Sequence, residues 1–337
     1  MTELPQGFTV HVANMGIKDD TDDVMVLNCE TSATAAGVFT RSRFAGPSVT
    51  ISRQHISSGT ARAVTVISKN ANVATGDTGL ANATEITQLV ATAIDADPSD
   101  VIIGSTGVIG VQYPMERIRS HLNALQTPFL ERSVDVAASA IMTTDTHPKV
   151  ASAVAGPATV VGFAKGVGMI EPDMATMIAV IATDADISTD HLNQIFRRVV
   201  DRTFNALSID TDTSTSDMAV VLASGIAGPV DDIQFEAALS DVCLDLTRQL
   251  AADGEGAETL IVVNVASARD DDQAQRVAKA IINSPLVKTA VHGRDPNWGR
   301  VAMAIGKCHD DTDIDQQAVT ICFGRQEVYP TPATAEA

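Results

Sequence analysis

The sequence predicts an α+β protein in which β-sheets are covered by helices. Short apolar segments rich in β-branched residues have the pattern of buried strands, and amphipathic segments between them have the pattern of helices. Several strands follow one another without a helix between them, which argues against a regular βα barrel. With 337 residues, 45% of them hydrophobic, the chain can bury a large core in one domain or two.

Six segments are predicted as buried strands because they are short, β-branched and bounded by turn residues. They cover residues 61–69, 100–104, 158–164, 176–183, 259–267 and 318–323.

Two segments carry the apolar spacing of amphipathic helices. The first covers residues 189–205 behind a candidate N-cap at Ser188, and the second covers 234–251. Their apolar positions recur at intervals of three and four residues, at Leu192, Ile195, Phe196, Val199, Val200 and Phe204 in the first and at Phe235, Leu239, Val242, Leu246 and Leu250 in the second.

Charge and composition exclude several classes of function. The net charge of −19, with no Lys/Arg cluster, repels a phosphate backbone and argues against nucleic-acid binding. No apolar run approaches the length of about 18 residues needed to cross a bilayer, and the first residues lack a signal-peptide pattern. We therefore expect a cytoplasmic protein. The four cysteines are far apart and show no metal-ligand spacing, so we expect reduced thiols and no metal site.

The most unusual stretch is KGVGMIEPDMATM, residues 165–177, where glycines, a proline and acidic residues precede an apolar strand that opens at Thr176. One interpretation is a glycine-rich turn between two strands. Another is an N→O acyl shift, in which the Thr176 oxygen attacks the carbonyl carbon of Ala175 and hydrolysis then frees an N-terminal threonine. A free α-amine titrates near about pH 8, so it can act as a base for that hydroxyl at neutral pH.

The same stretch resembles the cleavage-site motif of the ornithine acetyltransferases, a family of N-terminal-nucleophile enzymes also called glutamate N-acetyltransferases. Further motifs occur in the family's order over nearly the whole chain. They lie at residues 37–49, 70–76, 105–110, 142–146, 210–217, 253–257, 283–290 and 292–300. The amino-acid sequence of these motifs is most similar to that of the paralogue found in clavulanic acid gene clusters, as in FTRSRFAGPS (39–48) and NWGRVAMAIGKC (297–308).

The resemblance implies a fold and a reaction. The fold is a four-layer helix/sheet/sheet/helix sandwich of the self-cleaving ornithine acetyltransferase/aminopeptidase type. Cleavage between Ala175 and Thr176 gives an N-terminal α fragment, 1–175, and a C-terminal β fragment, 176–337. Acetyl passes from N-acetylornithine to glutamate through an acetyl-threonine ester, as a step of arginine biosynthesis. The family needs no cofactor and is usually made of two copies of each fragment.

The resemblance also implies roles for single residues. Thr176 is the nucleophile, and Thr106 and Gly107 form an oxyanion hole from a hydroxyl and a backbone N–H. Thr143 or Thr144, Lys165 and Glu255 match positions that contact the amino-acid substrate. The same residues also have structural interpretations, since Lys165 suits a solvated strand end, Glu255 an exposed turn, and the threonines helix caps.

Other motifs are assigned to structure. DTDTSTSD, residues 210–217, offers three carboxylates but lacks the glycine and distal glutamate of an EF-hand, so we expect side-chain hydrogen bonds that brace a turn. HGRDPNWGR, residues 292–300, holds the single tryptophan and is assigned to packing. Family members continue beyond the point where this chain ends, into a segment whose Asn and Thr bind the substrate, and we expect this form to bind substrate weakly.

Two other enzyme-like interpretations remain open. The first alternative to an acetyltransferase is a related self-cleaving aminopeptidase with the same nucleophile, and the second is a catalytically impaired relative that binds ligand. A nucleotide-binding module built on GFAKGVG, residues 162–168, is disfavoured because no G-x-G-x-x-G lies between a strand and a helix.

Overall fold

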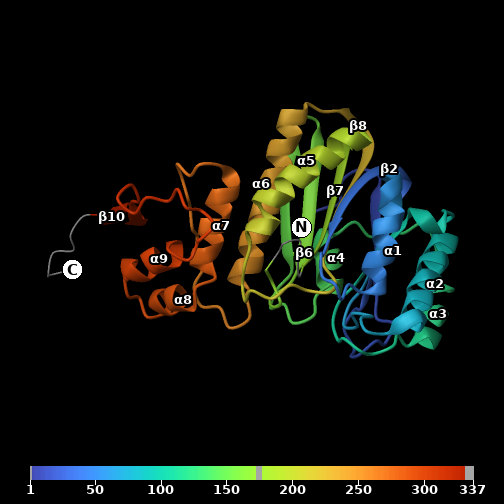
Figure 1. Ribbon diagram of the computed structural model, residues 1–337. Coiled ribbons are helices and arrows are strands. Elements are labelled where there is room, and N and C mark those ends of the chain that lie inside the picture. Colours follow the sequence, from blue (N-terminus) through green and yellow to red (C-terminus); the bar gives the residue numbers. More distant parts are fainter. Residues whose placement is uncertain (1, 172–176, 331–337) are drawn as a thin grey trace. The chain divides into compact units, whose positions relative to one another are not determined.

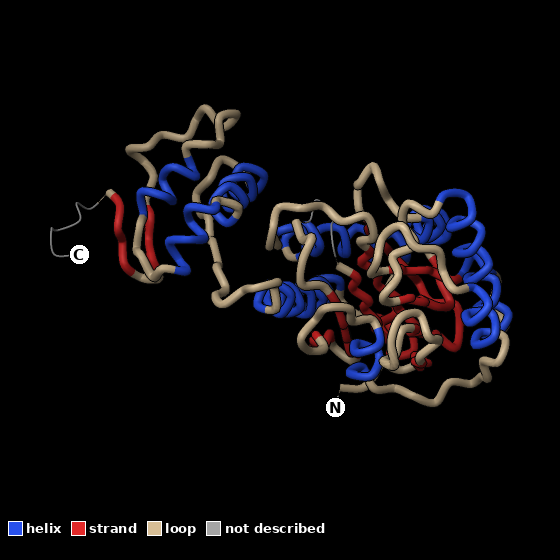
Figure 2. The backbone as a smooth tube through the Cα atoms, turned by 90° about the horizontal axis from the view of Figure 1, so that it is seen from below, coloured by secondary structure: helices blue, strands red, loops and turns tan. Residues whose placement is uncertain are grey.

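The structure is a computed structural model that describes residues 2–171 and 177–330. It divides into two compact units, one ending at Glu255 and the other beginning at Gly256. Figure 1 labels their helices and strands, and Figure 2 colours them by type.

The first unit holds most of the described strands and the longest helices. In chain order they are β1 (Phe8–Ala13), β2 (Val24–Phe39), α1 (Pro47–His55), β3 (Thr60–Ile67), α2 (Gly76–Ile94), β4 (Val101–Ser105), α3 (Met115–Leu122), α4 (Val134–Ala140), β5 (Lys149–Ala155), β6 (Ala158–Lys165), β7 (Ile178–Asp186), α5 (Thr189–Arg202), β8 (Met218–Pro229) and α6 (Asp232–Ala252).

One long strand, β2, joins the two halves of the sheet. The strand order is β4-β3-β2-β8-β7-β6-β5, with β1 also paired to β2. The first half of β2 pairs with β1 and β3, the register shifts between Asn28 and Ala33, and the second half pairs with β8. The pairs β3·β4 and β7·β8 are parallel and the others are antiparallel. Because β2 serves both halves, they belong to one hydrogen-bonded sheet.

Three buried clusters show that the two halves face each other. Side chains alternate along a strand, so each half has two faces. In β7, Val180 belongs to a core shared with β1 to β4, whereas Ile181 belongs to a core formed with α5 and α6. A third core lies between β2, β3, β4 and the helices α1 to α3. The layers are therefore helix, sheet, sheet and helix, which confirms the predicted α+β sandwich (Figure 1).

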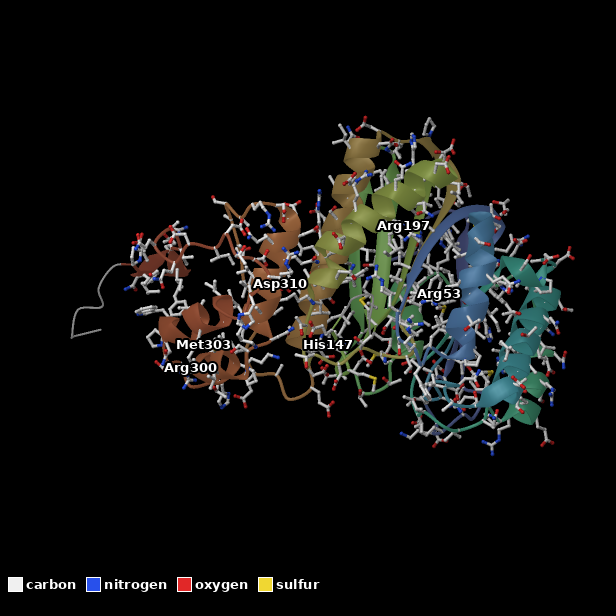
Figure 3. All side chains as sticks on the ribbon, viewed as in Figure 1. Arg53, His147, Arg197, Arg300, Met303 and Asp310 are labelled. Atoms are coloured by element: carbon white, nitrogen blue, oxygen red, sulfur yellow. The ribbon has the colours of Figure 1, made fainter. Side chains whose placement is uncertain are left out.

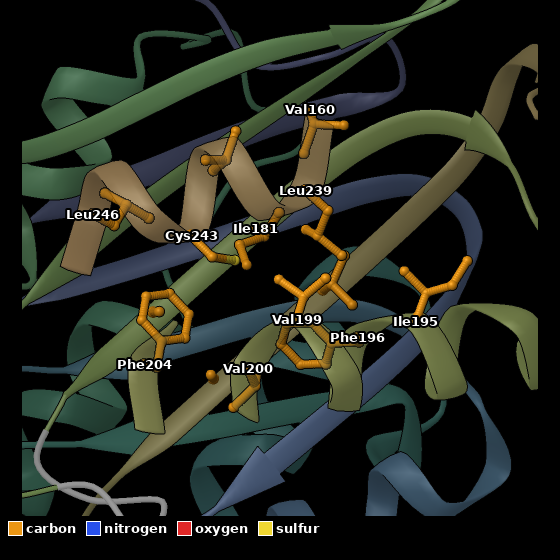
Figure 4. Packing of buried hydrophobic residues seen from close by; sticks show 14 of the residues in the cluster. Val160, Ile181, Ile195, Phe196, Val199, Val200, Phe204, Leu239, Cys243 and Leu246 are labelled. Atoms are coloured by element: carbon orange, nitrogen blue, oxygen red, sulfur yellow. The ribbon is translucent and has the colours of Figure 1, made fainter. Parts of the chain in front are cut away.

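The α5/α6 core shows why these two segments fold as helices. Phe196, Val199 and Val200 of α5 belong to the same buried cluster as Leu239 and Cys243 of α6, and Figure 4 shows them pointing into the space between the two helices. Each helix thus buries the stripe that its apolar spacing predicted, and both helix predictions are confirmed within a few residues. Ser188 is the N-cap of α5, but its side chain makes no capping hydrogen bond.

Four strand predictions correspond to β3, β4, β6 and β7, and the segment 318–323 is a strand only at Ile321–Phe323. The prediction for 259–267 is wrong. Val263 and Val265 pack against the core of the second unit, but no strand among the described residues pairs with this segment. The alternation of side chains is present, whereas the hydrogen-bonding neighbour that makes a strand is not.

The second unit is a small helical body with its own core. Its elements are α7 (Asp271–Ile282), α8 (Pro285–His292), α9 (Trp298–Ile305), β9 (Ile321–Phe323) and β10 (Gln326–Tyr329). Trp298 packs against Tyr329 with ring centroids 5.0 Å apart, and Asn297 caps α9, so HGRDPNWGR has the packing role expected of it. Of the helices in residues 2–171 and 177–330, none has the length and apolarity needed to span a membrane.

Candidate active site

Three strand ends meet at one edge of the first unit. Lys165, the last residue of β6, pairs with Ile178, the first residue of β7, and Ile178 pairs with Met218, the first residue of β8. The residues just before Ile178 and Met218 therefore lie beside the end of β6. The predicted cleavage site, Ala175 and Thr176, lies outside the described residues, and Met177 is the first described residue after it.

The loop after β4 requires a glycine. Gly107 has a φ of +130°, and a Cβ there would lie 2.2 Å from the carbonyl carbon of Lys69. The Thr106 N–H donates to the Ile67 carbonyl at 3.0 Å, and the Val108 N–H donates to the Lys69 carbonyl at 3.2 Å. The backbone on both sides of Gly107 is thus fixed, which suits a group that must hold a developing charge in one place.

Hydrogen bonds from α1 fix the strand that leads to this loop. The Ser48 and Ser105 hydroxyls lie 2.6 Å apart, and Ser105 also contacts the Tyr113 hydroxyl. Ser52 donates to the Ile103 carbonyl at 2.7 Å and accepts from the Ile103 N–H at 2.8 Å. Burial raises the pKa of Tyr113 to about 12, so this phenol remains a neutral hydrogen-bonding group.

Lys165 connects β6 to the loop after β4. Its Nζ lies 3.0 Å from the Thr106 Oγ1, and the side chain is buried. Burial lowers the pKa of Lys165, while the Asp145 carboxylate opposes that shift. An ammonium can only donate, so the Thr106 oxygen accepts and its own hydrogen points elsewhere. The hydroxyl is thereby free to donate to a third group, as an oxyanion hole requires.

A fully buried lysine, Lys149, joins two carboxylates near this edge. Its Nζ lies 2.7 Å from Asp145 Oδ1 and 2.6 Å from Asp253 Oδ2, and its exposed fraction is 0%. Burial alone raises the pKa of each acid. The neighbouring lysines, together with hydrogen bonds, nevertheless hold the pKa of Asp145 and of Asp253 below the ordinary value. Both acids are therefore ionised and paired.

The Asp145 carboxylate also fixes backbone on two other segments. It accepts from the Gly166 N–H at 2.6 Å, directly after Lys165, and from the Thr143 N–H at 3.1 Å. Lys149 and Asp145 thus hold two of the predicted substrate-binding positions in one network. Thr144 is exposed.

The Asp253 carboxylate extends that network toward Glu255. It accepts from the Thr146 N–H at 3.1 Å and from the Thr146 hydroxyl. His147, labelled in Figure 3, lies with its Nδ1 3.7 Å from Asp253 Oδ1. Two residues on, the Glu255 N–H donates to the Val167 carbonyl at 2.6 Å, so Glu255 is held beside the segment that follows Lys165.

The segment 166–171 is shaped by groups that the motifs only partly revealed. A Cβ at Gly168 would lie 2.9 Å from Glu255 Oε2, so a larger residue there would displace this carboxylate. Asp210 accepts from the Ile170 N–H at 2.8 Å and also from the Met169 N–H. The expectation that the 210–217 motif braces a turn is confirmed for Asp210.

The sequence analysis predicted Thr106, Lys165, Thr143 and Glu255 as site residues, and the network brings their segments together. It gave no role to Lys149, Asp145 or Asp253. A lysine four residues after an aspartate usually forms an exposed pair, and the sequence carries no signal that this pair is buried.

Comparison with known proteins gives a consistent result. The profile of the ArgJ family matches residues 9–337. Glutamate N-acetyltransferase Oat2 of Streptomyces clavuligerus is 58% identical over 335 residues, which cover 99% of this chain and 85% of that protein. Arginine biosynthesis bifunctional protein ArgJ 2 of Nostoc sp. is 55% identical over 335 residues, covering 99% and 87%.

Among solved structures, ornithine acetyltransferase complexed with ornithine from Mycobacterium tuberculosis is 29% identical, with a TM-score of 0.43. The match covers 50% of this chain and 92% of that chain. The sequence matches agree with the resemblance inferred from the motifs.

Proposed function

The chain belongs to the ArgJ family, and from that premise we propose that it is a self-cleaving acetyltransferase that moves acetyl from N-acetylornithine to glutamate. The observation that carries the proposal is 58% identity to a glutamate N-acetyltransferase over 99% of the chain. The loop at Thr106 and Gly107, tied to Lys165, supplies the kind of donors that acyl transfer needs.

Self-cleavage comes first. The Thr176 hydroxyl attacks the carbonyl carbon of Ala175, the bond from that carbon to the Thr176 nitrogen breaks, and an ester forms. Water hydrolyses the ester and leaves the fragments 1–175 and 176–337. The new α-amine of Thr176 is then the base that its own hydroxyl requires.

Acetyl transfer follows in two half-reactions. The Thr176 oxygen attacks the acetyl carbon of N-acetylornithine, ornithine leaves with a proton on its amine, and an acetyl ester remains on Thr176. The amine of glutamate then attacks this ester. In both half-reactions the Thr106 hydroxyl and the Gly107 N–H stabilise the oxyanion. Proton transfers balance each step, so the reaction needs no cofactor.

Four positions are proposed to bind the amino acid. Lys165 suits a carboxylate and Glu255 suits an amine, while Thr143 and Thr144 offer hydroxyls to the same zwitterion. The support for this assignment is the network around Asp145 and Asp253, which holds the backbone of these segments together. We further propose a cytoplasmic enzyme with two copies of each fragment, and light scattering of the purified protein tests that assembly.

The direct test uses Thr176→Ala. The wild type is expected to give two fragments in intact-mass measurement, the second beginning at Thr176, and to form N-acetylglutamate from N-acetylornithine and glutamate. Thr176→Ala has no oxygen to attack Ala175 or to carry acetyl, so it is expected to remain one chain without transfer. A wild type that stays intact, or a variant that is still cut at 175–176, would contradict the proposal.

A further inference from the structure

The loop after β4 lies on the segment that follows β3. Backbone hydrogen bonds join residues 106–110, which carry the proposed oxyanion donors and are called the oxyanion loop, to residues 67–73, called the support segment. The pairs, with the N–H donor first, are Thr106 and Ile67, Val108 and Lys69, Ala71 and Val108, and Gly110 and Val73. The position of the oxyanion loop therefore depends on the backbone conformation of the support segment.

The support segment has an unfavourable backbone conformation where the oxyanion loop contacts it. Lys69 has a φ of +72°, in the left-handed region that residues with a side chain rarely adopt. Gly107 lies directly against this residue, since a Cβ at Gly107 would be 2.2 Å from the carbonyl carbon of Lys69 and 2.5 Å from its Cα. A return of Lys69 to negative φ would redirect the carbonyl that accepts from the Val108 N–H. Other contacts must therefore hold Lys69 in this conformation.

The side chain of Lys69 makes those contacts. Its Nζ lies 2.5 Å from Asp19 Oδ1 and 2.7 Å from the Thr21 carbonyl, and it also donates to the Thr21 hydroxyl. An ammonium has three hydrogens, and these acceptors use all of them. Lys69 is 9% exposed, so its charge is buried and paired. The ammonium is thus committed to the protein and is not available to bind a substrate carboxylate.

The acceptors belong to a loop that is itself fixed. Residues 14–22 lie between β1 and β2, and the Thr21 N–H and hydroxyl donate to Asp19 Oδ1 at 3.1 and 2.7 Å. The carboxylate of the fully buried Asp23 accepts from the Met15 N–H at 2.6 Å and from the Ile17 N–H at 2.7 Å. Lys69 is therefore anchored to a braced segment of backbone.

We propose that Lys69 is a positioning residue for acyl transfer, an inference that rests on the proposed function. Its side chain anchors the support segment to residues 14–22, and this anchor keeps the Lys69 backbone in the left-handed region. The Lys69 carbonyl then holds the Val108 N–H, so the Gly107 N–H between the two segments stays in one place. Lys69 does not touch the substrate. Its loss should therefore slow the transfer step and leave substrate binding unchanged.

Two substitutions of Lys69 separate backbone conformation from charge. Both Lys69→Met and Lys69→Gly remove the ammonium, but only glycine adopts a φ of +72° without strain. In Lys69→Met we expect kcat to fall about 10- to 100-fold, since small displacements of a positioned group have effects of this size. KM should not change, because the lost interaction acts only in the transition state. Lys69→Gly should keep kcat within about fivefold of the wild type.

The matched control is Lys18→Met, which removes an exposed lysine from residues 14–22 and should keep the wild-type kcat. Transfer from N-acetylornithine to glutamate is measured per cleaved chain. Hydrogen exchange, followed by mass spectrometry of peptides from residues 105–112, gives a second measurement that needs no activity. We expect the Val108 amide to exchange faster in Lys69→Met than in Lys69→Gly or the wild type.

The outcomes separate this inference from the proposed function. A wild type without transfer contradicts the proposed function, and equal exchange in the wild type and Lys69→Met then overturns the inference as well. If the wild type is active, a folded Lys69→Met with the wild-type kcat overturns it. Equal losses of kcat in Lys69→Met and Lys69→Gly would also overturn it, because the charge and not the backbone conformation would then matter.

Asp19→Ala decides the question if Lys69→Met does not fold. The Asp19 side chain is 50% exposed, so its removal weakens the anchor of Lys69 without emptying a core position. We expect kcat to fall about 2- to 10-fold, the equivalent of one hydrogen bond, with KM unchanged. A wild-type kcat in Asp19→Ala would overturn the inference.

Discussion

Asp145 and Asp217 are two buried carboxyls near the same lysine, Lys165, and they differ in nearly every other respect. Asp145 receives two backbone N–H groups and the Lys149 ammonium, and its pKa lies below the ordinary value despite burial. Asp217 has no hydrogen-bond partner among the described residues, and burial raises its pKa. The comparison teaches that burial alone does not assign a role. The Asp145 carboxylate holds segments of the candidate site together, whereas Asp217 makes no such contact among the described residues.

Removing the lysine that pairs with Asp145 and Asp253 should have the largest effect on the free energy of unfolding. Lys149→Met leaves Asp145 and Asp253 buried without their cation, and the free energy of unfolding is expected to fall by about 3–5 kcal/mol. Urea unfolding followed by circular dichroism measures it. The control is Arg119→Met, which removes an exposed ion pair with Glu85 and should cost about 0–1 kcal/mol. Equal losses in the two variants would show that Lys149 is not a buried hub.

The strands and the ion pairs of Lys149 show how much of the structure can be predicted from the sequence. β3, β4, β6 and β7 are compact apolar runs, so periodicity alone found them. The sequence analysis missed β2 because polar residues interrupt the apolar pattern of this 16-residue strand. The two halves of β2 pair with different strands, so no single pattern runs along its whole length. The segment 259–267 has the apolar pattern of a strand but no partner strand in the part of the chain that the structure describes, and pairing depends on residues far away in the sequence.

The same limit applies to the site. The motifs predicted Thr106 and Lys165 as site residues, and the contact between them depends on β4 and β6 ending at one edge of the sandwich. The sequence did not indicate that Lys149 and Asp217 are buried, because a lysine and a loop aspartate are ordinarily exposed. Only the folded chain shows that both are buried, and that one is paired while the other is not.

Thr106 contacts Lys165, the lysine near both Asp145 and Asp217. Replacing Thr106 therefore tests acyl transfer without changing either carboxyl. Thr106→Ala removes the hydroxyl that we propose as an oxyanion donor and the acceptor of Lys165, so acyl transfer should slow by about 10²–10³-fold, or about 2.7–4 kcal/mol of barrier. Steady-state rates measured beside circular dichroism check this. An unchanged rate in a folded variant would remove Thr106 from the mechanism.

The two asparagine variants sharpen the comparison directly. Asp145→Asn replaces a charged acceptor of three hydrogen bonds and should lower the free energy of unfolding by about 1.5–3 kcal/mol. Asp217→Asn replaces a carboxyl that has no hydrogen-bond partner among the described residues, so it should change the free energy of unfolding by less than about 1 kcal/mol. Urea unfolding at neutral pH measures both. A large loss in Asp217→Asn would mean that the native carboxyl is ionised and paired after all.

The smallest expected effect is in the dependence of stability on pH, where the two acids act with opposite signs. The native pKa of Asp145 lies below its unfolded value, so its contribution is present above about pH 4 and is lost as pH falls. The native pKa of Asp217 lies above its unfolded value, so the folded state binds the extra proton. Its contribution is complete below about pH 4 and is lost as pH rises toward the raised pKa.

Each group changes the slope of unfolding free energy against pH by at most about 1.4 kcal/mol per pH unit. Urea titrations of the wild type and both asparagine variants over a range of pH measure the slopes. Relative to the wild type, Asp217→Asn should lose less stability as pH rises above about 4, and Asp145→Asn should lose less as pH falls below that value. Lys165 remains in every variant, so its own titration largely cancels in the differences. Curves that run parallel in all three proteins would mean that the two carboxyls titrate alike, and the contrast between a paired and an unpaired acid would fail.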